Sequence, residues 1–277
     1  MLARHPKLSE LIVALPGNHD VNVVDRANPA RLDLPMSPKK RLRQLRTLSA
    51  LEVLQGSRVR VVDQRTGQLG ELLSNALGPH RDAMRAFSDK GSPRLSRTLA
   101  KLWTSLFPMI QPPDSVHGLG IIVLNSNAET HFSFTNALGI VSVEQARALD
   151  AVVRQYPEAC WIVALHHHVV EYPKPAAALS ERIGTALING TWFVRKLQSV
   201  ADHVVVMHGH RHVDWIGEWG RLLIVSAPSP VMEATDGSDT YFYVHTLAAD
   251  QKRRVRLLEP ERIEIRGVRD AGAPATA

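Results

Sequence analysis

Residues 160–168 read CWIVALHHH, so a six-residue apolar run passes directly into three histidines. A short apolar run that ends in polar residues is typical of a buried strand. Two further segments follow the same pattern, LIVALPGNHD at 11–20 and HVVVMHGHRH at 203–212. Ligand sites in α/β proteins lie beyond the carboxyl ends of the strands. We therefore expect the three polar clusters to meet at one edge of a sheet.

The rest of the chain predicts an α/β protein, because strand-like and helical patterns alternate. Strands are expected at 11–15, 59–63, 118–124, 160–165 and 203–207. Helices are expected at 38–55, at 80–107, from Ser142 through Val153, and near 179–200. The dense strand patterns after residue 203 predict a second, partly antiparallel sheet. Residues 21–115 are interpreted as a helical cap within a single domain of residues 1–270, and 271–277 as a disordered tail.

The composition indicates whether the chain spans a membrane or forms disulfide bonds. Its 277 residues are 44% hydrophobic, and no apolar run approaches the 18 or more residues of a membrane span. The only cysteine, Cys160, lies in an apolar run and is expected to be an inert core thiol. No apolar leader is visible in MLARHPKLSE. We therefore expect a cytoplasmic protein without a membrane span or disulfide bond.

A net charge of +6 favours anionic partners, and the clearest basic cluster is SPKKRLRQLR at 37–46. One interpretation is a solvated face of the helix that Ser37 and Pro38 begin. The alternative is a lid that faces phosphate groups, with nucleic acid as the partner. The second interpretation requires Lys39, Lys40, Arg41, Arg43 and Arg46 to be available at the surface.

The histidines carry the chemical signal. At least six of the 13 histidines lie in the three clusters. Imidazoles that converge from separate strand ends are better explained by a transition-metal site than by structural roles. His210 and His212 stand two apart across a turn, and Asn18 adds a neutral carbonyl ligand beside them. The pattern predicts a metal centre at the strand ends.

The ordered set GNHD, a strand ending in HHH, and GHRH resembles the calcineurin-like metallophosphoesterases over roughly residues 10–225. The resemblance implies a four-layer α/β/β/α sandwich. It also implies a pair of divalent ions (Mn, Fe, Zn or Co) that hydrolyses a phosphodiester or phosphomonoester substrate. Two cations about 3.5–4 Å apart can clamp phosphate oxygens and activate a bridging hydroxide.

The resemblance also assigns roles to individual residues. Asn18, His166 and His210 resemble the ligands of the second metal, and His212 resembles a ligand of the first. His19 resembles the histidine that contacts the phosphate and assists the leaving oxygen, with Asp20 orienting it. His167 is expected to contact substrate or support the ligands, as is His168, and His208 is expected to be a bystander.

Two motifs of the family are missing. An Asp-x-His and a Gly-Asp-x-x-Asp normally precede GNHD and supply the bridging carboxylate, and the chain contains neither. We therefore expect that the first β-α-β segment is lacking, that strand 11–15 has lost its neighbours, and that at most one metal binds, weakly. Asp20, Asp214 and Glu233 are the carboxylates that could take over the bridging role. A non-catalytic metal- or ligand-binding relative and a nuclease of the same superfamily remain alternatives.

Overall fold

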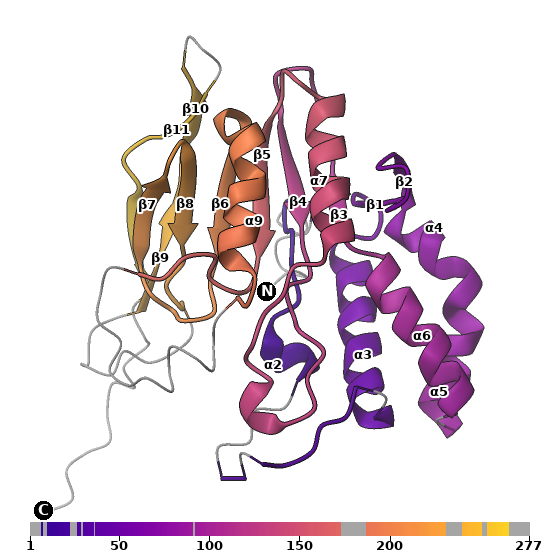
Figure 1. The fold of residues 1–277 in the computed structure, drawn as a ribbon. Helices are drawn as coiled ribbons and strands as arrows, with labels where there is room; N and C mark the ends of the chain where they lie inside the picture. The colour runs from indigo at the N-terminus through magenta and orange to yellow at the C-terminus, as the bar shows by residue number, and fades with distance from the viewer. Residues whose placement is uncertain are drawn as a thin grey trace, which may run out of the picture.

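The computed structural model describes Lys7 and residues 10–22, 27–28, 30–35, 37–90, 92–172, 187–230, 240–250 and 254–265. Its centre is an eight-stranded mixed sheet in the order β2-β1-β3-β4-β5-β6-β8-β7 (Figure 1). The sheet is flanked by helices, which confirms the α/β class. The strands are β1 Arg60–Val62, β2 Leu69–Leu72, β3 Met109–Gln111, β4 Leu119–Val123, β5 Cys160–Leu165, β6 Val204–His208, β7 Trp215–Trp219 and β8 Leu222–Ser226.

The middle of the sheet is parallel, and this places the histidine clusters together. Strand β5 pairs in parallel with both β4 and β6, and β6 pairs in parallel with β8. Because neighbouring parallel strands end at the same edge, β5 delivers His166 and β6 delivers His208 next to each other. Leu165 and His208 are register partners across these two strands.

Two helices cover the front of the parallel strands. Helix α7, Val143–Gln155, begins as predicted, with the Ser142 hydroxyl accepting a hydrogen bond from the Gln145 backbone N–H at 3.2 Å. Helix α9, Gly190–Leu197, packs beside it in front of β5 and β6 (Figure 1). The two helices enclose one hydrophobic core with Ile122, Trp161, Val163, Val206, Ile224 and their neighbours on the sheet.

A second core lies where four helices pack against the other face of β3 and β4. These helices are α3 Pro38–Gln55, α4 Leu73–Leu77, α5 Arg81–Lys90 and α6 Pro93–Ser105. Met109 and Val123, which are register partners, contribute the sheet side of this core. Residues 60–111 thus place three strands in the main sheet. The proposed division into a domain of residues 1–270 with a cap at 21–115 stays a prediction.

Two predicted helices are shorter than expected. The helix expected at 80–107 is two helices, α5 and α6, because Pro93 opens a new first turn and disfavours helical backbone before it. Of the helix expected at 179–200, residues 179–186 lie outside the described part of the chain. The remainder is α9, which begins after Asn189, followed by a 3₁₀ helix at Gln198–His203.

Residues 11–15 are not a strand, contrary to the prediction. Residues 12–17 have no assigned secondary structure and no ladder pairing to any described strand, and side chains bind part of their backbone instead. The Gln55 amide accepts from Ala14 N–H at 2.7 Å and donates to Ala14 C=O at 3.1 Å, while Arg58 donates to Ile12 C=O. The apolar pattern alone therefore could not show that this segment lacks a strand partner.

The predicted second sheet is also corrected. Strands β7 and β8 belong to the main sheet, and only two-stranded ribbons follow them among the described residues. One ribbon pairs β9, Thr240–Val244, with β12, Glu261–Ile265; the other pairs β10, Leu247–Ala249, with β11, Val255–Leu257. Within the described ranges, no helix is both long and apolar enough to cross a membrane.

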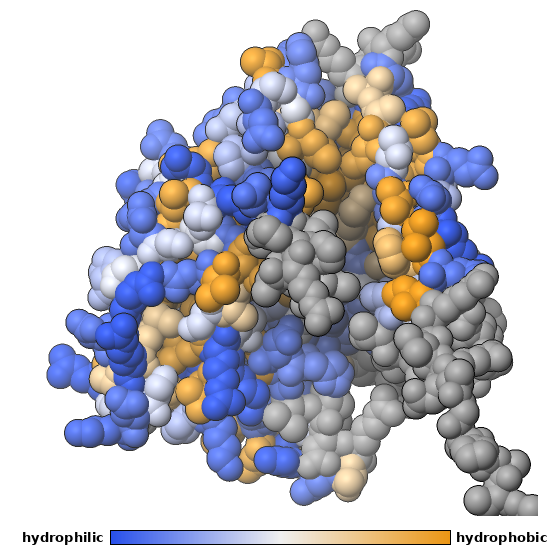
Figure 2. Space-filling model, turned by 180° about the vertical axis from the view of Figure 1, so that it is seen from behind, coloured by the Kyte–Doolittle hydropathy of each residue, from blue (hydrophilic) through white to orange (hydrophobic). Residues whose placement is uncertain are grey.

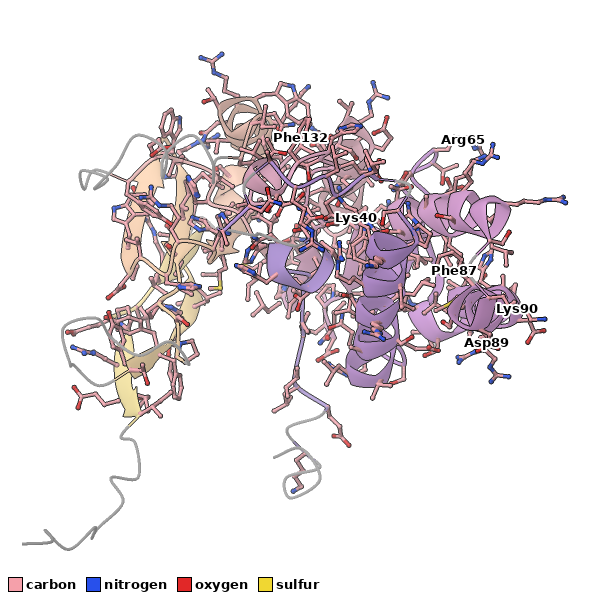
Figure 3. All side chains as sticks on the ribbon, turned by 90° about the horizontal axis from the view of Figure 1, so that it is seen from below. Lys40, Arg65, Phe87, Asp89, Lys90 and Phe132 are labelled. Atoms are coloured by element: carbon pink, nitrogen blue, oxygen red, sulfur yellow. The ribbon has the colours of Figure 1, made fainter. Side chains whose placement is uncertain are left out.

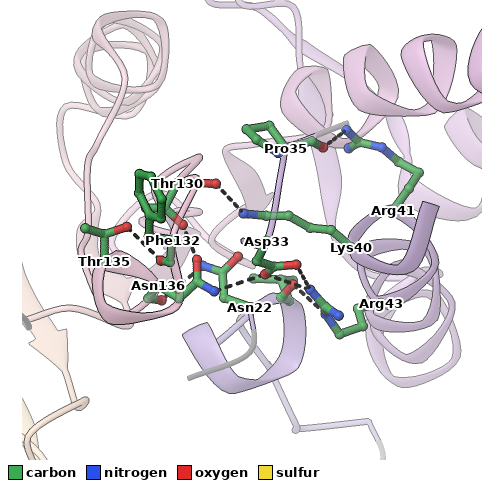
Figure 4. A network of polar contacts seen from close by, with 11 residues as sticks. Asn22, Asp33, Pro35, Lys40, Arg41, Arg43, Thr130, Phe132, Thr135 and Asn136 are labelled. Carbon is green, nitrogen blue, oxygen red and sulfur yellow. Dashed lines mark hydrogen bonds and ion pairs between the residues drawn. The ribbon is translucent and has the colours of Figure 1, made fainter. Parts of the chain in front are cut away.

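The basic cluster of α3 is largely internal, which corrects the lid interpretation. Lys40 and Arg41 are buried, and Lys40 donates to Thr130 C=O at 3.4 Å (Figures 3 and 4). Arg43 donates to both Asp33 carboxylate oxygens, at 3.0 and 2.9 Å. Burial lowers the pKa of Lys40, and Asp33 partly opposes this effect. Only Lys39 and Arg46 of the five basic side chains are exposed.

Candidate metal centre

The GNHD segment forms a single helical turn, α2, Asn18–Val21. The Asp20 carboxylate accepts a hydrogen bond from Gly17 N–H at 2.8 Å, and Asp20 N–H donates back to Gly17 C=O at 3.2 Å. This reciprocal bonding holds the start of the turn and buries Asn18 while leaving His19 exposed. Asp20 therefore shapes the turn that presents Asn18.

Donor atoms of two separate segments lie close to Nε2 of His166. The Asn18 side-chain oxygen lies 2.8 Å from His166 Nε2, and His166 Nε2 lies 2.9 Å from His210 Nδ1. Ligand atoms about 2.1 Å from a common cation at right angles are about 3 Å apart, given ordinary metal–nitrogen distances. The two distances to His166 Nε2 therefore match the spacing of neighbouring ligands of one cation.

Burial keeps the imidazoles of this cluster in the neutral form that binds metals. Burial lowers the pKa of His166 to about 4, and the charges of His19 and His212 add to the effect. Burial likewise lowers the pKa of His210 to about 3, helped by His166 and His168. A neutral imidazole has one ring nitrogen lone pair available, so both side chains are poised as ligands near neutral pH.

His212 and His19 lie at the rim of the cluster. Both rings act electrostatically on His166 and His210, which places them nearby, although neither forms a hydrogen bond with the three inner donors. His210 and His212 have φ values of 73° and 54°, in the left-handed region. Non-glycine residues held there cost of order 1–3 kcal/mol each and persist only where surrounding contacts enforce the conformation.

The contacts that enforce this turn involve residues that the sequence patterns did not single out. The Ser226 hydroxyl donates to Val213 C=O at 2.6 Å and also binds the Tyr172 hydroxyl at 2.8 Å. Gly209 N–H donates to His166 C=O at 3.1 Å, tying the turn to the end of β5. A serine at the carboxyl end of β8, next to His208 in the register, is the only sequence clue to this arrangement.

His167, His168 and His208 are buried near the inner three residues. His167 is fully buried, and its Nδ1 lies 2.8 Å from the Ser126 hydroxyl, while its ring centroid lies 4.5 Å from that of His210. His168 is buried and stacks on Tyr172 and His210. Burial also lowers the pKa of His208, to about 3. His167 lies between Ser126 and His210, and its role stays a prediction.

No carboxylate joins the cluster in the described residues. Asp214, one of the carboxylates that could take over the bridging role, accepts from the Tyr243 hydroxyl at 2.8 Å and the Tyr241 hydroxyl at 3.4 Å. Glu233 lies outside the described residues. Among the described residues, no three His, Cys, Asp or Glu side chains form a metal-binding group. One amide and two imidazoles thus fit a single cation, whereas a pair of cations lacks the anionic bridge that would offset their repulsion.

Comparison with known proteins adds little to this geometry. No family model matches the chain, and no curated protein matches it. Among solved structures, it is similar to a crystal structure of a putative 5′-nucleotidase from Staphylococcus aureus in complex with α-ketoglutarate. The identity is 13% and the TM-score 0.30, with 94% of this chain and 55% of that chain covered. The chain thus spans about half the length of that protein, and so loose a likeness carries no argument about function.

Proposed function

We propose that this chain carries the second-metal half of a metallophosphoesterase centre, with Asn18, His166 and His210 as ligands and His212 at the rim. The observation that carries the proposal is the meeting of three donor atoms 2.8 and 2.9 Å apart from segments far apart in sequence. A divalent cation held there would polarise a phosphate ester and lower the pKa of a bound water. Mn, Fe, Zn and Co all suit mixed nitrogen and oxygen donors.

His19 is the residue proposed to act on the substrate. It is exposed beside the buried donors and precedes Asp20, whose carboxylate holds the turn. An imidazole in this position can contact a phosphate oxygen and donate a proton to the leaving oxygen. The substrate class proposed is a phosphodiester or phosphomonoester.

We propose that hydrolysis of the phosphate ester also needs carboxylate ligands. The described residues place none beside Asn18, His166 and His210. We expect the 277-residue chain to bind one metal weakly and to hydrolyse phosphate esters negligibly. A chain extended by an upstream Asp-x-His and Gly-Asp-x-x-Asp would bind two metals and be active. The calcineurin-like four-layer sandwich is part of the same proposal.

Metal titration with and without the upstream extension tests this proposal. The expected result is one weakly bound Mn²⁺ or Zn²⁺ per 277-residue chain, lost in an Asn18→Ala variant. Two tightly bound ions with robust hydrolysis of bis-p-nitrophenyl phosphate by the 277-residue chain would contradict it. No metal binding by either form would also contradict it.

The nuclease alternative is weakened by the burial of the basic cluster. Lys40, Arg41 and Arg43 are engaged inside the protein, which leaves Lys39 and Arg46 from that cluster to meet a phosphate backbone. Non-specific binding of nucleic acid relies on several accessible cations. A small phosphate ester is therefore the favoured substrate.

A further inference from the structure

A cavity lies between helices α7 and α9, in front of the main sheet (Figure 1). Its volume is about 380 Å³. Its floor consists of apolar side chains that are buried in the core under these two helices: Ala146, Leu149, Phe193, Leu197 and Val200. Pockets that bind small molecules measure about 300–1,000 Å³ and are lined mostly by apolar side chains. The size and the floor of this cavity therefore suit a small molecule.

The cavity is separate from the proposed metal centre. Every residue that lines it belongs to α7, to α9 or to the 3₁₀ helix that follows α9, and none belongs to the histidine clusters at the strand ends. Figure 2 shows the opposite face of the molecule, where hydrophobic side chains gather in and beside another hollow. The main sheet lies between that face and the two helices (Figure 1). The cavity is thus a feature of the front helices alone.

Each of the two helices presents an apolar side chain and a cation to the cavity. On α7 these are Val143, which is 44% exposed, and Arg147. On α9 they are Trp192, which is half-buried, and Lys196. Residues four positions apart are neighbours on one face of a helix, so each cation lies beside its apolar partner. Both helices therefore combine an apolar contact with a positive charge at the same cavity.

The charges that line the cavity favour an anion. Asp150 is its one carboxylate, and Arg154 donates to both oxygens of that carboxylate, at 2.9 and 3.1 Å. Arg147 and Lys196 are exposed, and within the described residues neither side chain has a hydrogen bond or an ion pair. Three cations and one carboxylate leave two positive charges in excess. An anionic group bound here would meet two cations that have no competing partner.

We propose that the cavity between α7 and α9 binds a small amphiphilic anion, a free molecule whose apolar body carries one carboxylate or phosphate group. The Arg147 guanidinium offers a planar fork of donors that matches two oxygens of such a group. Lys196 adds a second cation from the other helix. The apolar body packs against Trp192, Val143 and the buried floor. The site is independent of the proposed metal centre and goes beyond it.

An acidic segment of a partner protein fits the cavity less well than a small molecule. Twelve residues line the cavity, whereas a standard protein interface uses about 20–30 residues on each side. Helix α9 has eight residues and is therefore only about 12 Å long. The lining is thus too small for a stable protein interface, although it is large enough to enclose a small ligand.

Isothermal titration calorimetry with three simple probes tests the proposed ligand chemistry. Octanoate, kept below its micelle-forming concentration, carries both an apolar body and a carboxylate. Octylammonium has the same body with the opposite charge, and acetate has the carboxylate without the body. We expect the 277-residue chain to bind one octanoate, and to bind octylammonium and acetate at least about tenfold more weakly, because each lacks one of the two required features.

A charge-matched pair of variants locates the binding site. Arg147→Gln with Lys196→Gln should weaken octanoate binding at least about tenfold, because hydrogen bonds to charged groups are lost. The control, Arg94→Gln with Arg195→Gln, removes the same number of charges from α6 and α9. Both control side chains are exposed and neither lines the cavity. We expect octanoate affinity in the control to stay within about twofold of the original chain.

Trp192 supplies an optical readout at the same cavity. Octanoate should change the tryptophan emission of the original chain, which has five tryptophans. Trp192→Phe should lose most of that change while it keeps most of the affinity measured by calorimetry, because phenylalanine retains an apolar aromatic surface. An emission change that persists in Trp192→Phe would place octanoate elsewhere and overturn the proposal.

The remaining outcomes that would overturn the proposal concern the ligand. These are the absence of octanoate binding, equal affinity for octanoate and octylammonium, and unchanged octanoate affinity in Arg147→Gln with Lys196→Gln. A helical peptide rich in Leu and Glu that binds through Arg147 and Lys196, where octanoate does not, would identify a protein segment as the occupant and overturn it also. None of these measurements involves a metal, so a failure of the proposed metal centre leaves them readable.

Discussion

The side-chain oxygen of Asn18 lies 2.8 Å from Nε2 of His166, although 148 positions separate the two residues in the chain. His210 Nδ1 approaches the same ring nitrogen at 2.9 Å. The segments that carry these three atoms meet near the edge of the sheet at which the parallel strands β5 and β6 end. The contact between Asn18 and His166 is thus the geometric basis of the proposed metal centre.

Removing either partner of that contact should weaken metal binding. We expect Asn18→Ala and His166→Ala each to lower the affinity for Zn²⁺ or Mn²⁺ by at least about tenfold, because each removes a ligand. Isothermal titration calorimetry of the purified variants measures this effect. The matched control is His117→Ala, since His117 is exposed and lies beside Glu158, away from the cluster. Unchanged affinity in His166→Ala would rule out ligation by this residue.

The left-handed backbone at His212 makes a distinct prediction about stability. At φ 54°, alanine is strained while glycine is not. We expect His212→Gly to be more stable than His212→Ala by about 1 kcal/mol in urea unfolding. Both variants should lose whatever metal affinity His212 contributes. Equal stability of the two variants would show that the turn relaxes when the imidazole is removed.

The Ser226 hydroxyl should stabilise both the fold and the histidine turn. Ser226→Ala leaves Val213 C=O and the Tyr172 hydroxyl without this partner, which should cost about 1–3 kcal/mol of unfolding free energy. Metal affinity should fall as well, because the turn carrying His210 and His212 loses its anchor. Ser226→Thr retains a hydroxyl and should restore affinity if it packs. Unchanged metal affinity in Ser226→Ala would show that the hydrogen bonds of Ser226 do not affect the metal site.

The buried histidines should make the metal-free chain sensitive to acid. His166, His208 and His210 have folded-state pKa values of about 4, 3 and 3, below the ordinary value of 6.5. The unfolded chain therefore binds more protons below pH 6.5, so stability is full above that pH and is lost as pH falls toward the folded values. Each group should cost about 1.4 kcal/mol at pH 5.5. Urea unfolding at pH 7.5 and 5.5 measures the loss, and a flat profile would contradict the burial of these rings.

The basic residues of α3 should separate into structural and surface groups. Arg43→Gln leaves the Asp33 carboxylate, which is mostly buried, without its cation, so the unfolding free energy should fall by about 3 kcal/mol. Lys39→Gln with Arg46→Gln should leave stability within about 0.5 kcal/mol, because both side chains are exposed. Thermal or urea unfolding of the two variants tests the contrast. A destabilised Lys39/Arg46 variant would show an unrecognised contact.

The sequence by itself determined the parallel centre of the fold and the location of the histidine cluster. The apolar runs before His166 and His208 predict strands from neighbouring residues alone. The histidines that follow them mark where those strands end. The placement of Asn18, His166 and His210 beyond apolar runs was the pattern from which their convergence was predicted. Parallel pairing of β5 with β6 brings His166 near the segment that carries His210, whereas Asn18 arrives from a segment that is not a strand.

Only the tertiary structure decided what depends on distant residues. Segment 11–15 has strand-like composition, yet its backbone is bonded by Gln55, 41 positions away from Ala14, instead of by another strand. Lys40 looks like a surface cation in the sequence, yet Thr130 and its loop enclose it. The role of Ser226 likewise exists only because β8 ends beside the turn at Val213. The local sequence pattern does not predict these contacts, because long-range packing determines which side chains are buried and which hydrogen-bond partners they have.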